Sequence, residues 1–364
     1  MPYIETGGAG FSDGYVERLA AMADTLAATL DDTGRPPRQG DADGAEGLLV
    51  DGTGFDRVAS LLATCRALFG APTWWPANAS TDMRAAIWSA AATPQPVAPR
   101  PELRPSLFAD AGMAILRDDG PRGDALWCRC DHGPHGFLSI AGHAHADALS
   151  IELRCGGVEV LADPGTYCYG SEPAWRTWER STAAHNTLEL FGRDQAESAG
   201  PFLWSSAPRT RLIDCSGLGD GDVARWSAEH DGYARIRRGV NHRRTVTLER
   251  AARRVAIDDG ITGDARAPAR LCFQLGPTIA VTLEGAVAEL RWQRDGAARG
   301  ARLSLPSTLA WSVHVGATEP PRGWYSAHFG SREPAPLLVG AGTIAPGETL
   351  CTLVEFDAPA AGAA

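Results

Sequence analysis

The sequence predicts a mainly β protein, a large antiparallel β-sandwich preceded by a short all-α segment. Helical periodicity is confined to roughly the first ninety residues. A proline-rich stretch follows, and beyond it short runs of alternating apolar and polar residues continue to the C-terminus. These observations place a helical segment at 1–92, a linker at 93–105 and a β domain at 106–364.

Three helices are expected in the N-terminal segment. In residues 15–30 apolar side chains recur at steps of three and four, and Ser12 or Asp13 is a suitable N-cap. A second helix is expected at 55–70, ended by Gly70, and a shorter one at 82–91. Three short helices form a small core, so we expect them to belong to a larger helical assembly. In the second helix the positions expected to be buried are Phe55, Val58, Leu61, Leu62, Cys65 and Leu68.

The β domain is predicted from fourteen short runs separated by Gly, Pro and Asp turns. Residues 93–105 carry five prolines, which favours an extended linker. Many short strands at regular spacing are typical of a sandwich. The runs are 112–118, 125–131, 136–142, 148–154, 158–163, 186–192, 242–250, 254–259, 270–276, 281–285, 288–292, 302–306, 309–315 and 350–356.

The charge composition narrows the function classes. The net charge is −10, which argues against general nucleic-acid binding. All 34 basic residues are arginines, so neither a lysine Schiff base nor a P-loop lysine is available. An acidic ligand would be held by Arg, whose planar guanidinium binds carboxylate or sulfate in a bidentate manner.

Targeting and redox signals are absent from the sequence as it stands. It contains no run of 18 apolar residues, and the N-terminal residues lack the basic and apolar regions of a signal peptide. The eight cysteines are scattered without a C-x-x-C pair, so neither a disulfide framework nor a zinc ribbon is expected.

The stretch GHAHADALS, residues 142–150, places His143, His145 and Asp147 at alternate positions. On a strand these side chains would project to the same face. Five of the nine histidines lie within residues 132–185, which marks this region as a candidate site. Imidazole and carboxylate together suit zinc or a similar metal. Metal binding, proton transfer and a solvated sheet face all remain open at this point.

Two later residues strengthen the metal hypothesis. Asp163 precedes a Pro-Gly turn, and His185 begins another expected strand. Two histidines, one carboxylate and a water form a common tetrahedral zinc shell. A regular hairpin about Gly156-Gly157 would, however, send Asp163 to the face opposite His145. The metal hypothesis therefore requires a bulge between His145 and Leu149 or a turn at Asp163.

The segment from Gly142 to Gln195, GHAHADALSIELRCGGVEVLADPGTYCYG…WRTWERSTAAHNTLELFGRDQAE, resembles the C-terminal β-domain of the heparinase II/III family of polysaccharide lyases. The later AEHDGYARI…GVNHRRTVTLER resembles its continuation. PPRQGDADGAEGLLVDG is similar to the end of the family's (α/α) toroid, so the resemblance implies that segment 1–92 is the remnant of such a toroid.

The resemblance implies roles for individual residues. It implies that His145, Asp163 and His185 bind a zinc ion, which holds the loops in place rather than reacting. It implies that His143 faces the substrate cleft and is catalytic. Tyr167 matches a cleft tyrosine of the family, and Tyr169 is an alternative for that position. The family also implies an acidic polysaccharide as partner, such as a glycosaminoglycan, and an envelope or periplasmic location is common among relatives.

The implied reaction is β-elimination at a uronic acid, and the residue types suit it. The proton α to the carboxylate is removed and the 4-O-linked sugar leaves, which requires a base and an acid such as His and Tyr. The helical segment here is shorter than the family's toroid, which contributes part of the cleft. A zinc-stabilised module that binds acidic glycans without cleaving them is therefore the alternative function.

Two other metal families use the H-x-H spacing. Metallo-β-lactamase-like hydrolases require H-x-H-x-D-H, but Ala148 occupies the position of the last histidine. Cupins require a glutamate four or five residues after H-x-H, whereas Glu152 lies seven residues beyond His145. Neither pattern is complete here.

Overall fold

The computed structural model describes residues 12–44, 56–77, 82–91, 97–118, 120, 124–219 and 221–358. Contacts within the chain define two units, Met1–Pro37 with Ala45–Ser106, and Arg38–Gly44 with Leu107–Ala364. Segment 38–44, which the sequence placed in the helical segment, thus belongs to the β unit. The mainly β class expected from the sequence is confirmed.

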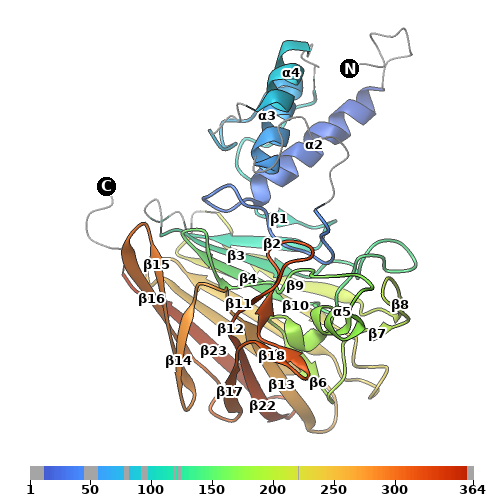
Figure 1. The fold of residues 1–364 in the computed structure, drawn as a ribbon, viewed down its shortest axis with the longest axis vertical. Helices are drawn as coiled ribbons and strands as arrows, with labels where there is room; N and C mark the ends of the chain where they lie inside the picture. Colours follow the sequence, from blue (N-terminus) through green and yellow to red (C-terminus); the bar gives the residue numbers. More distant parts are fainter. Residues whose placement is uncertain are drawn as a thin grey trace. The chain divides into compact units, whose positions relative to one another are not determined.

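The helical unit contains the three expected helices, α2 (Asp13–Thr29), α3 (Arg57–Phe69) and α4 (Met83–Ala91), shown in Figure 1. The Ser12 hydroxyl accepts a hydrogen bond from the Tyr15 amide at 3.3 Å and caps α2. Gly70, with a φ of 68°, ends α3 as predicted.

The apolar faces of the helices form a small core. Ala27, Leu30, Leu62 and Trp75 are buried together. Leu61, which was expected in this core, is 49% exposed, because it lies on the outward face of α3. The predicted Phe55 lies outside the described residues.

The described part of the proline-rich segment, 97–105, contacts the helices and is not an unattached linker. The Arg100 guanidinium bonds the Asp24 carboxylate at 2.6 Å, and the Trp74 indole donates to the Pro101 carbonyl at 2.8 Å. Val97 packs against an apolar cluster of α2 and α3. The prolines thus favour an extended conformation of residues 97–105, and side-chain contacts hold this segment against the helices of the same unit.

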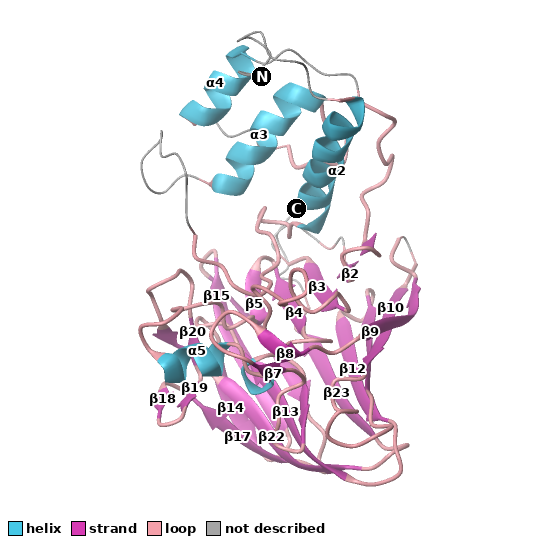
Figure 2. Cartoon of the chain, turned by 90° about the vertical axis from the view of Figure 1, so that its right-hand side faces the viewer, coloured by secondary structure: helices cyan, strands magenta, loops and turns pink. Residues whose placement is uncertain are grey.

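The β unit contains three main antiparallel sheets, with strand orders β14-β15-β16-β23-β12-β11-β10-β9, β1-β2-β3-β4-β5 and β17-β22-β13-β6 (Figures 1 and 2). A bridge between Leu161 and Leu275 links the second sheet to the third.
The strands of the first sheet are β9 (Thr210–Ser216), β10 (Val223–His230), β11 (His242–Glu249), β12 (Arg254–Ile261), β14 (Ala280–Glu284), β15 (Val287–Arg294), β16 (Ala297–Ser304) and β23 (Thr349–Phe356). Those of the other two are β1 (Leu107–Phe108), β2 (Met113–Arg117), β3 (Leu126–Asp131), β4 (Ile151–Cys155) and β5 (Val158–Leu161), then β6 (Leu188–Leu190), β13 (Ala267–Gln274), β17 (Ala310–His314) and β22 (Leu337–Ile344).

Short elements complete the unit. They are α5 (Pro173–Glu179), the 3-10 turn η1 (Thr182–Ala184), and the two-stranded ribbons β7 (Glu197–Ser198) with β8 (Trp204–Ser206), β18 (Ala317–Thr318) with β19 (Pro321–Arg322), and β20 (Trp324–Tyr325) with β21 (Glu333–Pro334).

One apolar core fills the space between the eight-stranded sheet and the other two sheets. Buried and less buried side chains alternate along β12 and β23, as expected for strands with one face on a core. β3 and β4 are buried on both faces. The candidate residues His143, His145 and Asp147 lie in the connection between these two strands.

All but one of the fourteen strand predictions overlap a strand. The exception is 136–142, which is a loop closed by a bridge between Phe137 and Gly142. Among strands of five or more residues, β9, β10 and β22 were not predicted. In β22 the apolar pattern is interrupted by Gly340, where a Cβ would approach the Trp311 ring to 2.6 Å. Close packing therefore selects glycine in a strand and removes the pattern.

A buried ion pair connects the eight-stranded sheet to the loops that precede β4 and β6. The Arg244 guanidinium bonds both oxygens of Asp259, at 2.8 and 2.9 Å, and both side chains are fully buried. Arg244 also donates to the carbonyls of Leu149 and Asn186. The His242 ring contacts Asp259 at 2.6 Å. One side chain thus satisfies buried acceptors on three segments.

Replacing Arg244 with Met should destabilise the β unit strongly, because it leaves the Asp259 carboxylate and two carbonyls buried without their donor. We expect the free energy of unfolding to fall by about 3–5 kcal/mol, measured by urea denaturation followed by tryptophan fluorescence. As control, Arg302→Met removes an exposed ion pair with Glu289 and should cost less than about 1 kcal/mol. Equal losses in the two variants would show that the buried pair has no special role.

Candidate functional site

The segment that carries the H-x-H pattern is a loop, not a strand. β4 begins only at Ile151, and residues 141–149 form turns. His143 has a φ of 63° and Leu149 one of 59°, values that side-chain-bearing residues adopt rarely. The expectation that His143, His145 and Asp147 share one strand face is therefore wrong.

The two histidines point in different directions as a result. The side chain of His143 is 69% exposed, whereas that of His145 is fully buried. The backbone of His143 is held by the Asp41 amide, which donates to its carbonyl at 3.0 Å. The Arg180 carbonyl accepts from the Ala146 amide at 2.9 Å. These bonds fix one imidazole inward and the other outward.

A bulge in the β4–β5 hairpin brings Asp163 to the side of the buried histidines. Gly156 and Gly157 form the tight turn, with φ values of 54° and 77°. Arg154 pairs with Glu159, but Leu153 pairs with Leu161, so the register shifts by one residue. A shift of one residue reverses which face each later side chain occupies. The bulge required by the metal hypothesis exists, in β5 rather than between His145 and Leu149.

Asp163 both makes a turn and faces the buried histidine of the next segment. Its Oδ1 accepts from the Gly165 amide at 2.8 Å, which closes the Asp-Pro-Gly turn. Its Oδ2 lies 3.6 Å from Nε2 of His185. Gly165, with a φ of 77°, admits no side chain, since a Cβ would lie 2.2 Å from the Ser326 carbonyl oxygen. The Asp163-Pro164-Gly165 turn thus also positions the Asp163 carboxylate next to His185.

The buried histidines meet at a short distance. Nδ1 of His145 lies 3.2 Å from Nε2 of His185. The other nitrogen of each ring faces an acceptor: Nε2 of His145 lies 3.0 Å from Asp41 Oδ1, and Nδ1 of His185 lies 2.8 Å from the Ser181 carbonyl. The structure therefore places Nε2 of His185 close to both other predicted ligands, 3.2 Å from His145 and 3.6 Å from Asp163.

This arrangement decides the tautomers. A carboxylate and a carbonyl only accept, so in the neutral rings the protons sit on Nε2 of His145 and Nδ1 of His185. The two remaining ring nitrogens then present lone pairs to each other. Facing lone pairs at this distance repel unless a cation lies between them. The arrangement can accommodate a proton or a metal ion there.

A second buried histidine pair in the same unit does not have this property. His230 accepts from the Gly232 amide through Nδ1, at 3.1 Å, and so carries its proton on Nε2. That Nε2 lies 3.2 Å from Nδ1 of His242, whose own Nε2 bonds Asp259. Each contact then joins one donor to one acceptor, and no cation is required. Of these two buried histidine pairs, only His145 and His185 direct two ring lone pairs at each other.

The geometry fits the ligand shell of a tetrahedral metal. Two nitrogens bonded to zinc at about 2.0–2.1 Å lie roughly 3.3 Å apart, close to the 3.2 Å between His145 and His185. Among the described residues, the group whose ligand atoms all lie within 4.8 Å of one another is Asp147, Asp163 and His185, without His145. Asp147, which is not part of the ligand set that the resemblance implies, is therefore within reach as a further carboxylate.

One buried arginine balances only part of the charge of these carboxylates. Arg129 is fully buried, 3.2 Å from Asp131 and 3.8 Å from Glu152. Burial, and then the neighbouring charge of Asp131, raise the pKa of Asp147 to about 7. The cluster is thus short of positive charge.

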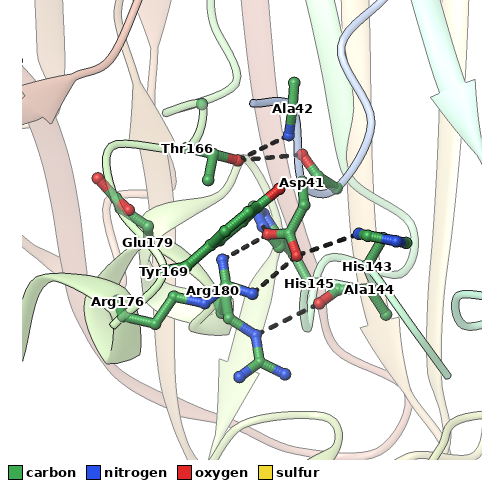
Figure 3. A network of polar contacts seen from close by, with 12 residues as sticks. Asp41, Ala42, His143, Ala144, His145, Thr166, Tyr169, Arg176, Glu179 and Arg180 are labelled. Carbon is green, nitrogen blue, oxygen red and sulfur yellow. Dashed lines mark hydrogen bonds and ion pairs between the residues drawn. The ribbon is translucent and has the colours of Figure 1, made fainter. Parts of the chain in front are cut away.

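Asp41 and Arg176 are the functional candidates that sequence reasoning missed. Figure 3 shows the Asp41 carboxylate between His145, His143 and Arg176. Arg176 binds both its oxygens, and Nδ1 of His143 lies 3.6 Å away. Burial raises the pKa of Asp41, but the bonds to His145 and Arg176 outweigh it and hold that pKa well below its usual range. Asp41 thus joins the inner and the outer histidine.

The two candidate tyrosines occupy different environments. The Tyr167 hydroxyl donates to Glu172 at 2.5 Å, and this bond raises its pKa. Tyr169 instead lies beside Asp41, with the Arg176 guanidinium 5.2 Å from its ring centroid (Figure 3). Burial, and then Asp41 and Asp43, raise the pKa of Tyr169 to about 12. Tyr169 is therefore the tyrosine nearer to the histidine site.

Asn186 and Arg180, which had no assigned role, serve as structural supports. The Asn186 amide donates to the carbonyls of Ile151 and Ala162, at 2.8 and 2.9 Å, and accepts from the Gln274 amide at 2.7 Å. It thus joins β4, β5 and β13 next to His185. Arg180 donates to the Ala144 carbonyl at 3.5 Å, on the loop between the two histidines.

A cavity of about 290 Å³ opens beside the loop. His135, His143, His145, Asp131 and Asp147 are among its lining residues. This volume is at the lower end of pockets that bind small ligands, which begin at about 300 Å³. The outward imidazole therefore stands at the wall of a polar cavity.

Comparison with known families identifies the class of protein to which this fold and site belong. The family model described as Heparinase II/III-like, C-terminal, matches residues 100–349. The chain therefore belongs to the heparinase II/III-like family. A search of curated protein sequences finds no match.

Solved structures with similar folds are larger lyases. A heparinase III gene product matches with a TM-score of 0.66 and 17% identity, over 95% of this chain and 47% of that one. Heparan sulfate lyase HepC from Pedobacter heparinus matches with 0.63 and 17%, over 95% and 47%. Another heparinase III gives 0.64 and 15%, over 95% and 49%. The chain spans about half the length of these proteins, and the likeness concerns the fold.

The pKa of Glu179 predicts a pH-dependent stability. Burial raises this pKa to about 7 from a usual 4.5, although backbone amides of Tyr167 and Cys168 partly oppose the shift. Between these values the folded state binds more protons than the unfolded state, so stability falls as the pH rises from about 4.5 to about 7. Glu179→Gln should remove this fall, raising stability at pH 8 relative to wild type by on the order of 2 kcal/mol.

Denaturation midpoints across pH 4–8 measure the effect. Glu249→Gln, at a half-exposed carboxylate paired with Arg254, is the matched control and should leave the slope unchanged. Parallel profiles for wild type and Glu179→Gln would contradict the assignment.

Proposed function

We propose that this protein is a polysaccharide lyase that cleaves uronic-acid-containing glycans by β-elimination. Family membership supports the lyase class. The observation that carries the proposal is the separation of the two histidines. An exposed imidazole at a polar cavity is coupled through Asp41 to a buried cluster that has the composition of a metal shell.

In the proposed reaction His143 is the general base. Its ring removes the proton at C5 of the uronate, α to the carboxylate. The electron pair of that bond forms the C4–C5 double bond, and the bond from C4 to the leaving oxygen breaks. Imidazole is the side chain used most often in this role. The 3.6 Å contact with Asp41 orients the ring.

Tyr169 is the proposed acid. The departing oxygen needs a proton, and a phenol whose pKa is raised to about 12 remains protonated at neutral pH. Its ring stands beside Asp41, which also contacts His143 (Figure 3). Tyr167 remains the candidate that the family resemblance favours, and its hydroxyl is committed to Glu172.

We propose that His145, Asp163 and His185 hold a zinc ion, with Asp147 as a further carboxylate in reach. The facing lone pairs and the 3.2 Å separation of the ring nitrogens support this. A bound zinc ion would supply positive charge that compensates the buried carboxylates. Asp41 and the Ser181 carbonyl orient the two rings, a task that outer hydrogen-bond partners commonly perform at metal sites.

Metal analysis tests the zinc proposal. Purified protein dialysed against zinc should retain about one zinc ion per chain, measured by inductively coupled plasma mass spectrometry. His145→Ala and His185→Ala should retain less than about a tenth of that amount, since each removes a ligand. His314→Ala, at a histidine whose ring contacts the Ser312 hydroxyl, should keep full occupancy. Unchanged zinc in both ligand variants would refute the site.

The lyase proposal is tested by product absorbance. Wild type incubated with heparan sulfate or another polyuronate should form an unsaturated product that absorbs in the ultraviolet. His143→Ala should lose about 10²–10⁴-fold in turnover, the usual contribution of a general base, while keeping its fold and zinc.

Tyrosine variants and glycan binding separate the remaining possibilities. Tyr169→Phe should lose more turnover than Tyr167→Phe, and the reverse order would reassign the acid. Wild type that binds these glycans without forming product would favour the alternative, a zinc-stabilised module that binds acidic glycans.

A further inference from the structure

A second cavity, larger than the first, lies beside α5. Its volume is about 940 Å³. Residues from α5, from the segment between η1 and β7, and from β19 line it. α5 also lies against β19, and Figure 2 shows these two elements at the same edge of the β unit. All its lining residues belong to the β unit.

Four guanidinium groups line this cavity, those of Arg193, Arg235, Arg270 and Arg322. Arg270 is neutralised by Glu189, whose carboxylate lies 2.5 Å away. Arg235 donates to a backbone carbonyl, which leaves its charge uncompensated. Within the part of the chain that the structure describes, neither Arg193 nor Arg322 forms an ion pair. Three arginines without an ion-pair partner among the described residues thus line the cavity, together with the carboxylates of Asp194 and Glu197, and their guanidinium groups can bind an anionic group of a ligand.

The remaining polar groups suit hydroxyl donors. Asp194 accepts from the Thr182 amide at 2.8 Å and has further acceptor capacity, and Glu197 is exposed at the rim. Carboxylate oxygens accept hydrogen bonds from sugar hydroxyls as readily as from amides. Arginine and carboxylate side by side therefore match a ligand that carries both anionic groups and hydroxyls.

Part of the wall is apolar and partly aromatic. Trp178, Ile236, Pro320 and Pro321 contribute to it, with Pro173 at the start of α5. Flat apolar surfaces contact the C–H faces of sugar rings, whose burial is favourable. The lining as a whole combines the three contacts that an acidic saccharide offers.

The cavity adjoins a smaller hollow near the proposed catalytic site. This hollow, of about 270 Å³, shares Pro173, Thr177 and Ser198 with the cavity. It is also lined by Tyr169 and Arg176, the residues next to Asp41. The arginine-lined cavity and the hollow beside Tyr169 therefore share part of their wall at α5.

We propose that the arginine-lined cavity is a distal binding subsite for an anionic segment of the polysaccharide, carboxylated or sulfated, several sugars away from the bond that is cleaved. This proposal rests on the proposed function. It accounts for three arginines at one cavity that form no ion pair among the described residues, in a protein of net charge −10.

Binding of short and long oligosaccharides tests the subsite. The probes are a tetrasaccharide and a dodecasaccharide of heparan sulfate, titrated calorimetrically against the full chain carrying His143→Ala, which prevents cleavage. The dodecasaccharide should bind more tightly than the tetrasaccharide. Adding Arg193→Gln and Arg322→Gln should weaken dodecasaccharide binding about tenfold, since two charge-assisted contacts are lost, and leave tetrasaccharide binding unchanged.

A control variant carries the same change of charge elsewhere. Arg225→Gln and Arg302→Gln remove two exposed arginines that pair with Asp214 and Glu289, and should bind both probes like the parent. Equal dodecasaccharide affinity in the test and control variants would overturn the subsite while tetrasaccharide binding and turnover still support the lyase. Failure of wild type to bind either probe would overturn the proposed function and the subsite together.

Discussion

The buried ion pair of Arg244 and Asp259 is the interaction on which the site depends. Two opposite charges in an apolar interior are stable only when their hydrogen-bonding capacity is satisfied. Arg244 meets this condition by donating to the Leu149 and Asn186 carbonyls as well as to Asp259. Those carbonyls belong to the two loops that carry the buried histidines. A change to the Arg244–Asp259 pair should therefore disturb both the sandwich core and the positions of the buried histidines.

A second constraint comes from segment 38–44, which lies far from the histidines in sequence. Its Asp41 binds Arg176 and the ring of His145, while its amide holds the backbone of His143 in a rarely populated conformation. A backbone of this kind costs on the order of 1–3 kcal/mol and persists only where the surroundings enforce it. The enforced turn separates two histidines that an ordinary strand would place on one face. The His145 imidazole thereby lies in the interior, and the His143 imidazole lies at the wall of the cavity.

Much of the fold could be predicted from the sequence, because alternation and turn residues report burial directly. The pattern failed where packing overrode it, as at Gly340 against Trp311, and where a left-handed residue broke the strand at His143. The contacts of His185 with His145 and with Asp163 were implied only by the family resemblance, since a bulge in β5 changes the register without a local signal. Asp41 could not be assigned, because no motif in the sequence around it indicates a contact with His145, which lies more than a hundred residues away in the chain.

The central proposal is that a zinc ion binds between the facing lone pairs of His145 and His185. Crystals grown with zinc, measured by anomalous diffraction at the zinc edge, test this directly. The account predicts an anomalous peak about 2.0–2.2 Å from His145 Nδ1, His185 Nε2 and an oxygen of Asp163. A zinc-containing crystal with no peak there, and a direct hydrogen bond between the two rings, would contradict it.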